Sequence, residues 1–339
     1  MVKETKIIRF HDSFDCRLDT IELQAPKDDE LQCKSLYSVI SIGTECGQFE
    51  KKFHESGHRI AEMGHPTATG YSTVAEVVEV GKDITDYKVG DIVFCHERHQ
   101  SYFNIDTSWR VYHMPKWMEP KEVCWTVILR GGMFAAMKCQ IQPTDTVVVM
   151  GCGIFGMASI MFAKMLGARN IVAIDPLKER AERAYQFGAS HVLVGETGDV
   201  VEEFLKLNDG KYADSAIDCT AVPAGLAQAC NIVRNDGNIA LLTDPPMLCE
   251  QAISSNILLR YQHIHGIFID MTALEPNAFG VSLQETHERI YEAFKSGDVH
   301  TLDMITHIVS PLDCQKIYSD IYADKSKYLG VLFDWSLIE

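Results

Sequence analysis

The 339-residue sequence has no Cys-x-x-Cys pair, and its 11 cysteines are scattered between Cys16 and Cys314. Zinc knuckles and disulfide frameworks cluster their cysteines, so neither is expected, and scattered thiols are typical of a reducing compartment. The most apolar stretch covers only residues 157–166, which is too short to cross a bilayer. Residues 1–6 are not followed by the long apolar run of a signal peptide. We therefore expect a cytoplasmic protein.

Basic residues are also scarce, since 31 Lys and Arg stand against 47 Asp and Glu, a formal net charge of −16. Such a surface repels phosphate backbones and anionic lipid headgroups, so we expect neither nucleic acid nor membrane as a partner. The length and the 46% hydrophobic content indicate a folded protein of two domains, or of one domain split by an insertion.

The first third of the chain has the pattern of short strands. Runs of β-branched and aromatic residues at 36–42, 73–80 and 90–94 are separated by Gly and Asp turns. This spacing is typical of a barrel or sandwich.

From about residue 120, helices and strands alternate. Residues 146–150 form a continuous apolar run of the kind that is buried in a parallel sheet. The alternation predicts a doubly wound α/β domain. The expected helices are 121–139, 157–166, 178–187, 224–233 and 284–295, and the expected strands are 170–174, 191–194, 215–218, 238–242 and 265–269, with a last strand at 328–334 that could rejoin the first domain.

A glycine-rich loop directly follows the apolar run. Residues 151–156 read Gly-Cys-Gly-Ile-Phe-Gly and open an expected helix. In a dinucleotide-binding loop the first glycine permits the tight turn, the second lets the backbone approach the pyrophosphate, and the third lets helix and strand pack closely. The helix N-terminus then offers unpaired N–H groups to the phosphates. The alternative, a glycine-rich turn in a non-binding α/β domain, is disfavoured because both flanking elements fit.

An acidic residue follows at the distance that ribose binding requires. Asp175 comes 19 residues after Gly156, at the end of the next expected strand. Its carboxylate would accept hydrogen bonds from the ribose and repel a 2′-phosphate, which favours NAD over NADP. Arg180 could offset that repulsion, but we expect it to flank the ribose of NAD. The expected cofactor-binding residues are Gly151, Gly153, Ile154, Phe155, Gly156, Asp175, Arg180 and Thr220.

Several further motifs resemble the medium-chain dehydrogenase/reductase family, which includes alcohol and polyol dehydrogenases. Besides the glycine loop they are Ser-Ile-Gly-Thr-Glu at 41–45, Val-Val-Glu-Val-Gly at 77–81, Gly-Asp-Ile-Val at 90–93 and Ile-Thr-His at 305–307. The resemblance implies an α/β protein with an active site in the cleft between two domains, and homodimers or homotetramers. The implied domains are a GroES-like, β-rich catalytic domain at 1–125 and 272–339 and a Rossmann, doubly wound nucleotide-binding domain at 126–271.

The zinc ligands of the family are missing from their expected positions. Zinc-dependent members have a cysteine where this chain has Ile42, and a histidine where it has Tyr71. The third ligand would fall near 126–128, where no cysteine or acid occurs, and the four-cysteine structural lobe is reduced to Cys95. The pattern is similar to a zinc-lacking branch that includes bacteriochlorophyllide dehydrogenase-like proteins. We therefore expect no bound metal.

A zinc site rebuilt from displaced groups is the alternative. Cys46, His65 and Glu45 have acceptable ligand chemistry. Their spacing does not match the ligand positions of the family, so we expect Cys46 and His65 to be ordinary loop residues.

Alcohol oxidation without a metal needs side chains that remove the hydroxyl proton while hydride goes to the nicotinamide. The resemblance gives Thr44 the position of a proton-relay hydroxyl and Glu45 that of an acid behind the metal, which could become a base or acceptor for the substrate. Tyr71 could donate to the substrate oxygen. His96 or His99, in the next loop, could shuttle the proton.

Each of these residues also has a plain structural interpretation. Thr44 could cap a turn, Tyr71 could be a core aromatic, and Glu45 could form a salt bridge, for instance to Arg130. Either histidine could lie on a surface loop. We favour the catalytic interpretation because all of these positions surround the substrate in the resembled fold.

The sequence therefore predicts a zinc-independent, NAD-dependent dehydrogenase that interconverts a secondary alcohol and its ketone. The many hydrogen-bonding side chains suit a small polar substrate such as a polyol, sugar or cyclitol. One alternative is a quinone or enoyl reductase, although Asp175 argues against the NADPH that such enzymes often prefer. Another is an enzyme that uses tightly bound NAD for transient oxidation during elimination or epimerisation. A third is a non-enzymatic nucleotide-sensing or structural protein on the same fold.

Overall fold

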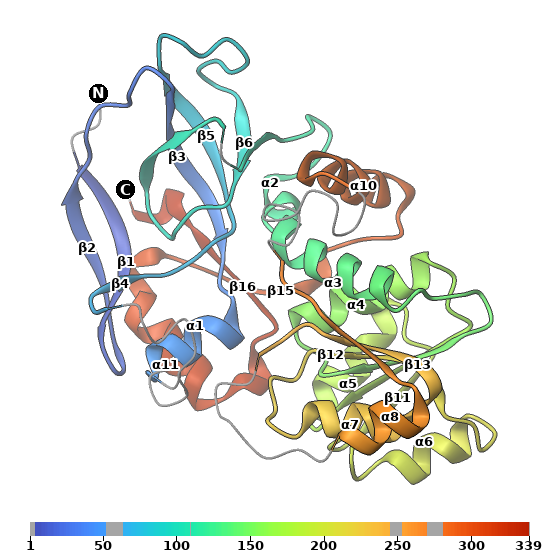
Figure 1. Cartoon of the computed structure of the whole chain (residues 1–339). Helices are drawn as coiled ribbons and strands as arrows, with labels where there is room; N and C mark the ends of the chain where they lie inside the picture. The colour runs from blue at the N-terminus through green and yellow to red at the C-terminus, as the bar shows by residue number, and fades with distance from the viewer. Residues whose placement is uncertain (1–3, 52–63, 109, 245–252, 270–280, 339) are drawn as a thin grey trace. The chain divides into compact units, whose positions relative to one another are not determined.

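The computed structural model describes residues 4–51, 64–108, 110–244, 253–269 and 281–338 (Figure 1). The chain forms two compact units. Unit 1 comprises residues 1–127 and 301–339, and unit 2 comprises residues 128–300. None of the helices in these described ranges has the length and hydropathy of a membrane-spanning segment.

Unit 1 is dominated by antiparallel strands. Its larger sheet has the order β15-β16-β3-β5-β6-β8, with β7 also paired to β3, and its smaller sheet has the order β2-β1-β4. The last strand of the chain, β16, pairs antiparallel with β3, so the expected return to the first domain is confirmed. The strands are β1 (Glu4–Asp12), β2 (Asp15–Glu22), β3 (Glu30–Val39), β4 (Thr67–Ala68), β5 (Thr73–Val80), β6 (Ile92–Cys95), β7 (Tyr102–Asp106), β8 (Val111–His113), β15 (Ile305–Val309) and β16 (Gly330–Asp334).

The strand expected at 36–42 is wrong at its end. β3 stops at Val39, and Ile42 instead opens helix α1 (Ile42–Phe49). The side chain of Glu45 reaches back and accepts a hydrogen bond from the Ser41 amide at 2.7 Å. This contact holds the chain in the helical turn, whereas the apolar pattern alone favoured a continuing strand.

An aromatic core lies between α1 and helix α11 (Cys314–Ala323) in unit 1. Phe10 and Phe49 are fully buried there, and the Phe10 ring meets the Tyr318 ring edge-on at 5.0 Å. Because these rings pack tightly, α11 carries Tyr318 toward the residues of α1.

Unit 2 is a doubly wound parallel domain, which confirms the expected fold. The strands described in this unit have the order β11-β10-β9-β12-β13-β14, and every neighbouring pair is parallel. The order reverses between β9 and β12, the place where such sheets bind dinucleotides. The strands are β9 (Thr146–Met150), β10 (Asn170–Asp175), β11 (His191–Val194), β12 (Ala213–Asp218), β13 (Val233–Leu241) and β14 (His263–Gly266).

Helices connect these strands. The long helix expected at 121–139 is split into α2 and α3. The helices are α2 (Pro120–Val123), α3 (Thr126–Lys138), α4 (Ile154–Met165), α5 (Lys178–Phe187), α6 (Val201–Leu207), α7 (Gly225–Ile232), α8 (Ser254–Arg260) and α10 (Leu283–Ser296).

The positions along the chain that divide the two units differ from the expected domain boundaries. The expected boundary at 271/272 would place α10 in the catalytic domain, but the structure places it in unit 2, which continues to His300. The ring of His300 stacks on that of Phe187 in α5 at 5.2 Å, and this contact holds the segment after α10 to unit 2.

Candidate functional site

The glycine loop of unit 2 has the geometry that its spacing predicts. Gly151 follows β9 with φ of +85°, a conformation that favours glycine. Gly153 is the N-cap of α4, and a Cβ added to it would meet nothing within 4 Å. A Cβ on Gly156 would lie 1.9 Å from the Gly151 carbonyl oxygen. The loop therefore turns at the first glycine, is open at the second and is closely packed at the third.

The first turn of α4 has no side-chain cap. In this turn Ile154 is buried and Phe155 half-buried. The amides of the first turn thus remain available to a ligand.

Asp175 lies beside the loop at the end of β10. Its Oδ2 accepts a hydrogen bond from the Cys152 amide at 2.7 Å, and its Oδ1 accepts one from the Leu177 amide at 2.8 Å. A carboxylate has about four acceptor positions, so lone pairs remain for ribose hydroxyls. Burial lowers the pKa of Arg180, and the charge of Asp175 opposes this shift, so the two expected ribose residues influence one another.

Thr220 follows the neighbouring strand β12. Its amide and its hydroxyl both donate to Asp218 Oδ1, at 2.9 and 2.7 Å. Burial raises the pKa of Asp218. Thr220 therefore shapes the loop after β12, next to β9 in the sheet.

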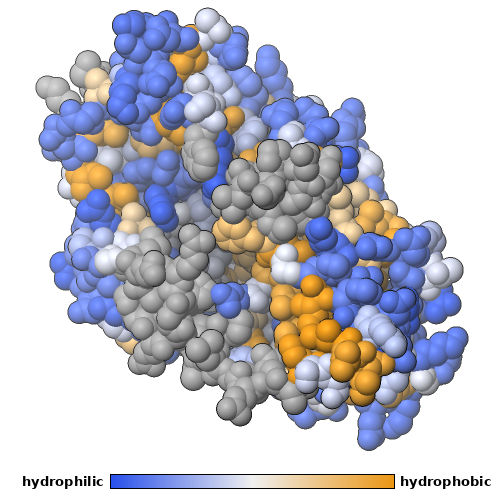
Figure 2. All heavy atoms as spheres, viewed as in Figure 1, coloured by the Kyte–Doolittle hydropathy of each residue, from blue (hydrophilic) through white to orange (hydrophobic). Residues whose placement is uncertain are grey.

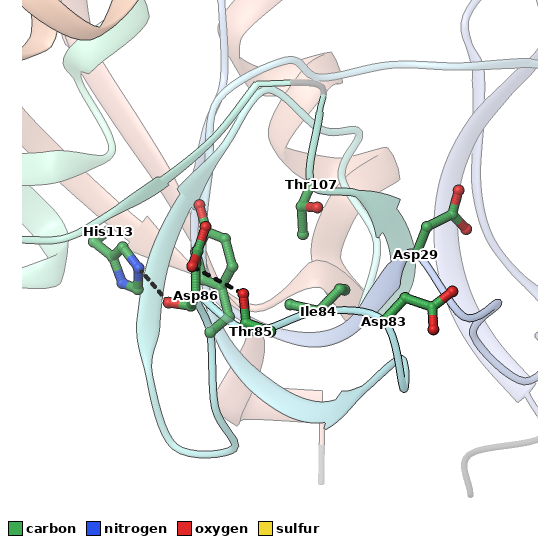
Figure 3. A pocket seen from close by; sticks show the side chains of 8 residues that line it. Asp29, Asp83, Ile84, Thr85, Asp86, Thr107 and His113 are labelled. Atoms are coloured by element: carbon green, nitrogen blue, oxygen red, sulfur yellow. Dashed lines mark hydrogen bonds between the residues drawn. The ribbon is translucent and has the colours of Figure 1, made fainter.

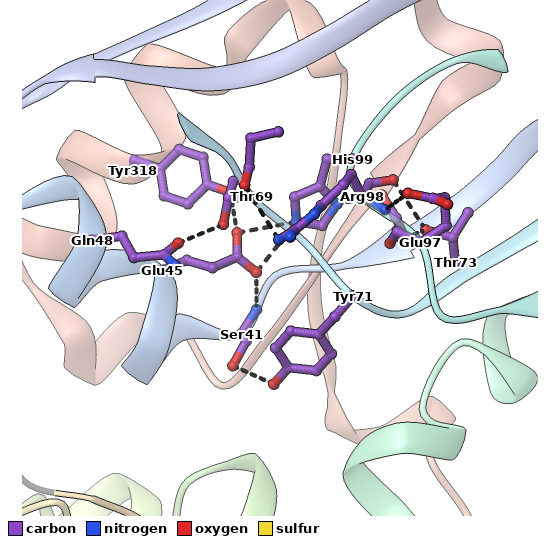
Figure 4. Close-up of polar contacts among 12 residues, drawn as sticks. Ser41, Glu45, Gln48, Thr69, Tyr71, Thr73, Glu97, Arg98, His99 and Tyr318 are labelled. Atoms are coloured by element: carbon purple, nitrogen blue, oxygen red, sulfur yellow. Dashed lines mark hydrogen bonds and ion pairs between the residues drawn. The ribbon is translucent and has the colours of Figure 1, made fainter. Parts of the chain in front are cut away.

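A second polar constellation lies in unit 1 and is centred on Glu45, which is 1% exposed (Figure 4). Its Oε1 accepts from the Ser41 amide, and its Oε2 accepts from the Tyr318 hydroxyl. His99 Nε2 lies 3.0 Å from Glu45 Oε2. Glu45 is thus held on several sides, which supports the structural interpretation of this acid, with His99 and Tyr318 as its partners.

His99 is fully buried, so the alternative interpretation of this histidine as a surface-loop residue is wrong. Its Nδ1 lies 2.8 Å from Ser38 Oγ, which accepts a hydrogen bond from Trp335 Nε1 at 2.9 Å. His99 Nε2 can donate to Glu45 while Nδ1 accepts from Ser38 Oγ, so both ring nitrogens have a partner. A Cβ on Gly70 would lie 2.7 Å from the His99 ring, so glycine at this position makes room for the histidine.

Thr44, Tyr71 and His96 are half-buried, in contrast to Glu45 and His99. The Tyr71 hydroxyl donates to Ser41 Oγ at 2.6 Å. The rings of Tyr71 and His96 lie 5.8 Å apart, and His96 Nδ1 contacts the guanidinium of Arg110. Thr44 lies in the first turns of α1, and its hydroxyl makes no hydrogen bond within the described chain.

The structure shows three members of this constellation that the sequence did not reveal, namely Ser38, Tyr318 and Trp335. Tyr318 is 273 residues from Glu45, and Trp335 is 297 residues from Ser38. No local motif marks them, because their roles arise from tertiary packing.

The alternative zinc ligands are not brought together. Cys46 is part of the aromatic core of unit 1, and burial raises the pKa of its thiol to about 12, which disfavours the thiolate that binds metal. His65 Nδ1 lies 3.0 Å from the Phe10 carbonyl oxygen. Across the described ranges no three His, Cys, Asp or Glu side chains are grouped to hold a metal ion.

A pocket of about 360 Å³ also lies in unit 1 (Figure 3). It contains none of the predicted site residues, and three of its lining residues are aspartates. The lining residues are Asp29, Asp83, Ile84, Thr85, Asp86, Tyr87, Thr107 and His113.

Comparison with known proteins identifies a family model. Residues 155–282 match the model described as zinc-binding dehydrogenase. The match begins after residues 42, 71 and 126–128, where the resemblance placed the missing zinc ligands, so it does not test whether zinc is bound.

Curated relatives match most of the chain. An uncharacterised zinc-type alcohol dehydrogenase-like protein of Escherichia coli is 24% identical, over 91% of this chain and 92% of its own length. The sorbitol dehydrogenase of Bacillus subtilis is 23% identical, over 78% of this chain and 84% of its own length.

Solved structures share the fold. An Escherichia coli oxidoreductase of unknown specificity, described as involved in membrane biogenesis, has a TM-score of 0.82 with 21% identity and covers 98% of this chain and 99% of its own. An alcohol dehydrogenase of Escherichia coli CFT073, solved with NADH, has a TM-score of 0.81 with 16% identity and covers 98% of this chain and all of its own.

Proposed function

This chain belongs to the medium-chain dehydrogenase/reductase superfamily, and from that premise we propose that it is an NAD-dependent oxidoreductase that interconverts a secondary alcohol and its ketone without catalytic zinc. Its relatives are oxidoreductases that act on alcohols and polyols, which supports the reaction class.

The observation that carries the proposal is the position of Asp175 beside the glycine loop. The carboxylate is held by the amides of Cys152 and Leu177 and has lone pairs left for the adenosine ribose. A fixed negative charge there disfavours a 2′-phosphate. This supports NAD over NADP. When bound, NAD accepts the hydride from the carbinol carbon.

The proton must leave the substrate hydroxyl by another route. Among the expected catalytic residues, the half-buried Tyr71 has a hydroxyl already bonded to a second hydroxyl, that of Ser41, at 2.6 Å. Tyr71 can accept the proton of the alcohol while it gives its own proton to Ser41 Oγ, and Ser41 in turn releases its own hydroxyl proton to water. Thr44 and His96 are the further half-buried groups that can bond a polar substrate.

The residues at the family's ligand positions support a reaction without zinc. Ile42 offers only carbon atoms and is buried. Tyr71 is engaged through its hydroxyl with Ser41. Neither residue type belongs to the cysteine, histidine and carboxylate set that binds zinc in proteins.

A panel of polyols, sugars, cyclitols and simple alcohols, each incubated with NAD and followed for NADH formation, tests the proposal. Turnover of a polyhydroxylated secondary alcohol with NAD, and much slower turnover with NADP, is expected. Reduction of an enone or quinone by NADPH would favour the reductase alternative. Conversion of a sugar without net NADH would favour transient oxidation by tightly bound NAD, and binding of NADH without any turnover would favour a non-enzymatic protein.

A homo-oligomer is part of the same proposal. Leu258 and Leu259 of helix α8 and Tyr261 just after it are 70–72% exposed. The Arg260 guanidinium anchors the helix by donating to the Cys230 carbonyl at 2.8 Å. Among the described strands, the neighbouring β14 is last in its sheet. Figure 2 shows hydrophobic residues gathered at the lower right, where Figure 1 draws α7 and α8. An unpaired edge strand beside an apolar helix suits a second copy of the same surface.

The cysteines support a cytoplasmic location as a further part of the proposal. All ten that the structure describes are free thiols, and nine of them are buried. Such cysteines are typical of a reducing compartment.

A further inference from the structure

We infer that a buried chain of hydrogen bonds, from His99 and Tyr318 through Glu45 to Ser41, positions the Tyr71 hydroxyl for the reaction. The inference deepens the proposed function, because it rests on Tyr71 as the group that contacts the substrate. Glu45, His99 and Tyr318 are then positioning residues that never touch the substrate. Figure 4 shows their side chains converging on the carboxylate of Glu45 from different elements.

The surroundings of Glu45 argue against a direct role as base. The carboxylate is 1% exposed and accepts from the Ser41 amide, the Tyr318 hydroxyl and His99 Nε2. Burial raises the pKa of the nearby Cys46 thiol, and the charge of Glu45 adds to that shift. Glu45 thus has no open side from which to remove a substrate proton.

Ser41 uses its hydroxyl in an unusual way for its position. A serine at a helix N-cap normally accepts a hydrogen bond from an amide of the first helical turn. Ser41 makes no such bond to α1, and its Oγ accepts from Tyr71 instead. Glu45, one turn further along, accepts a hydrogen bond from the Ser41 amide and so fixes the backbone of Ser41. The position of Ser41 Oγ, and with it the direction of the Tyr71 hydroxyl, therefore depends on a rigid Glu45.

Helix α11 offers a matched pair of tyrosines for a test. The hydroxyl of Tyr318 donates to Glu45 of α1, and that of Tyr322 donates to Glu50 just after α1 at 2.9 Å. Tyr318 is fully buried, whereas Tyr322 is 39% exposed. Each substitution by Phe removes one hydroxyl from the same helix and leaves the ring.

Tyr318→Phe is expected to lower kcat by between about tenfold and a hundredfold, because misplaced reacting groups cost rates of this order. The KM of the substrate and the Kd of NADH should stay within twofold, and Tyr322→Phe should change none of these constants. In a Tyr71→Phe background, Tyr318→Phe should have no further effect on kcat. If Tyr318→Phe lowers kcat by the same factor in the Tyr71→Phe background as in the parent protein, the inference is wrong.

A double-mutant cycle measured by unfolding tests the inference even if the protein oxidises no alcohol and the proposed function is wrong. Urea denaturation of the single and double variants measures whether Tyr71 and Tyr318 are coupled. A coupling of more than about threefold in the unfolding equilibrium constant is expected, since independent distant sites are additive to within about twofold. The Tyr71 and Tyr322 pair should be additive. Additivity of both pairs would show that the chain of hydrogen bonds does not join Tyr318 to Tyr71.

Discussion

In the glycine loop of unit 2, residues close in sequence make the geometry, since Gly151 and Gly156 approach within a single turn. In the Glu45 constellation of unit 1, the partners come from 54 and 273 residues away. The loop requires glycine at its closest approach, because a methyl group added at Gly156 would collide with the Gly151 carbonyl oxygen. The Glu45 constellation instead requires polar side chains that hydrogen-bond one another. Substitutions should therefore affect the two regions differently.

The largest effect should come from added bulk at the closest approach in the loop. Gly156→Ala forces a Cβ against the Gly151 carbonyl oxygen, so we expect the free energy of unfolding to fall by about 1–3 kcal/mol or more and NADH binding to be lost. Gly153→Ala is the control, since its Cβ meets no protein atom. It should fold like the parent yet bind NADH roughly 10- to 100-fold more weakly, because its methyl group occupies the approach to the pyrophosphate. Calorimetry of NADH binding and urea denaturation measure both effects, and equal behaviour of the two variants would contradict this account.

In unit 1, removal of the Tyr71 hydroxyl should lower the rate of the reaction and leave the fold intact. Tyr71→Phe is expected to lower kcat by about 10²- to 10⁴-fold, the range for loss of a positioned proton-transfer group. The bond lost is the one that the Tyr71 hydroxyl donates to Ser41 Oγ within unit 1, so NADH affinity should be unchanged. Steady-state kinetics and NADH titration test this, and a variant with full kcat would remove Tyr71 from the proton path.

A smaller effect is expected at the ribose acid. Asp175→Ala should weaken NADH binding by about 10- to 100-fold, since hydrogen bonds to a charged group contribute roughly 1.5–3 kcal/mol, and should reduce discrimination against NADPH. The exposed Glu179→Ala in the first turn of α5 is the control and should change neither affinity. Unchanged cofactor preference in Asp175→Ala would show that this acid does not contact the ribose.

The smallest effect on catalysis should come from the exposed face of α8. Leu258→Glu is expected to dissociate the oligomer at micromolar protein while kcat per chain stays within about twofold, because a buried unpaired charge opposes association. Leu312→Glu is the control, since Leu312 is similarly exposed in unit 1. Sedimentation velocity distinguishes the two variants, and an unchanged sedimentation coefficient for Leu258→Glu would exclude α8 from the interface.

The fold was predictable where local pattern decides it. The expected segments 73–80, 146–150, 178–187 and 191–194 coincide with β5, β9, α5 and β11. Each is a short periodic or apolar run whose burial follows from its own residues. The start of α1 was missed because the Ser41 amide is held by a side chain four residues on, a contact that the apolar pattern does not encode.

The two candidate sites differ in the same way. The loop residues and Asp175 could be found because their roles depend on spacing along the chain. Glu45 and His99 were identified, but their burial and mutual contact were not, and Tyr318 had no signal at all. A hydrogen bond between α1 and α11 depends on how two helices pack, and single-sequence periodicity says only which face of each is apolar.

The most direct test is turnover of protein whose metal content has been measured. We predict that protein treated with chelator and dialysed, with far less than one zinc per chain, will oxidise its alcohol with NAD at the rate of untreated protein. Added zinc should not increase that rate. Stoichiometric zinc that leaves together with the activity, and restores the activity on return, would contradict the assignment of the proton path to Tyr71 and Ser41.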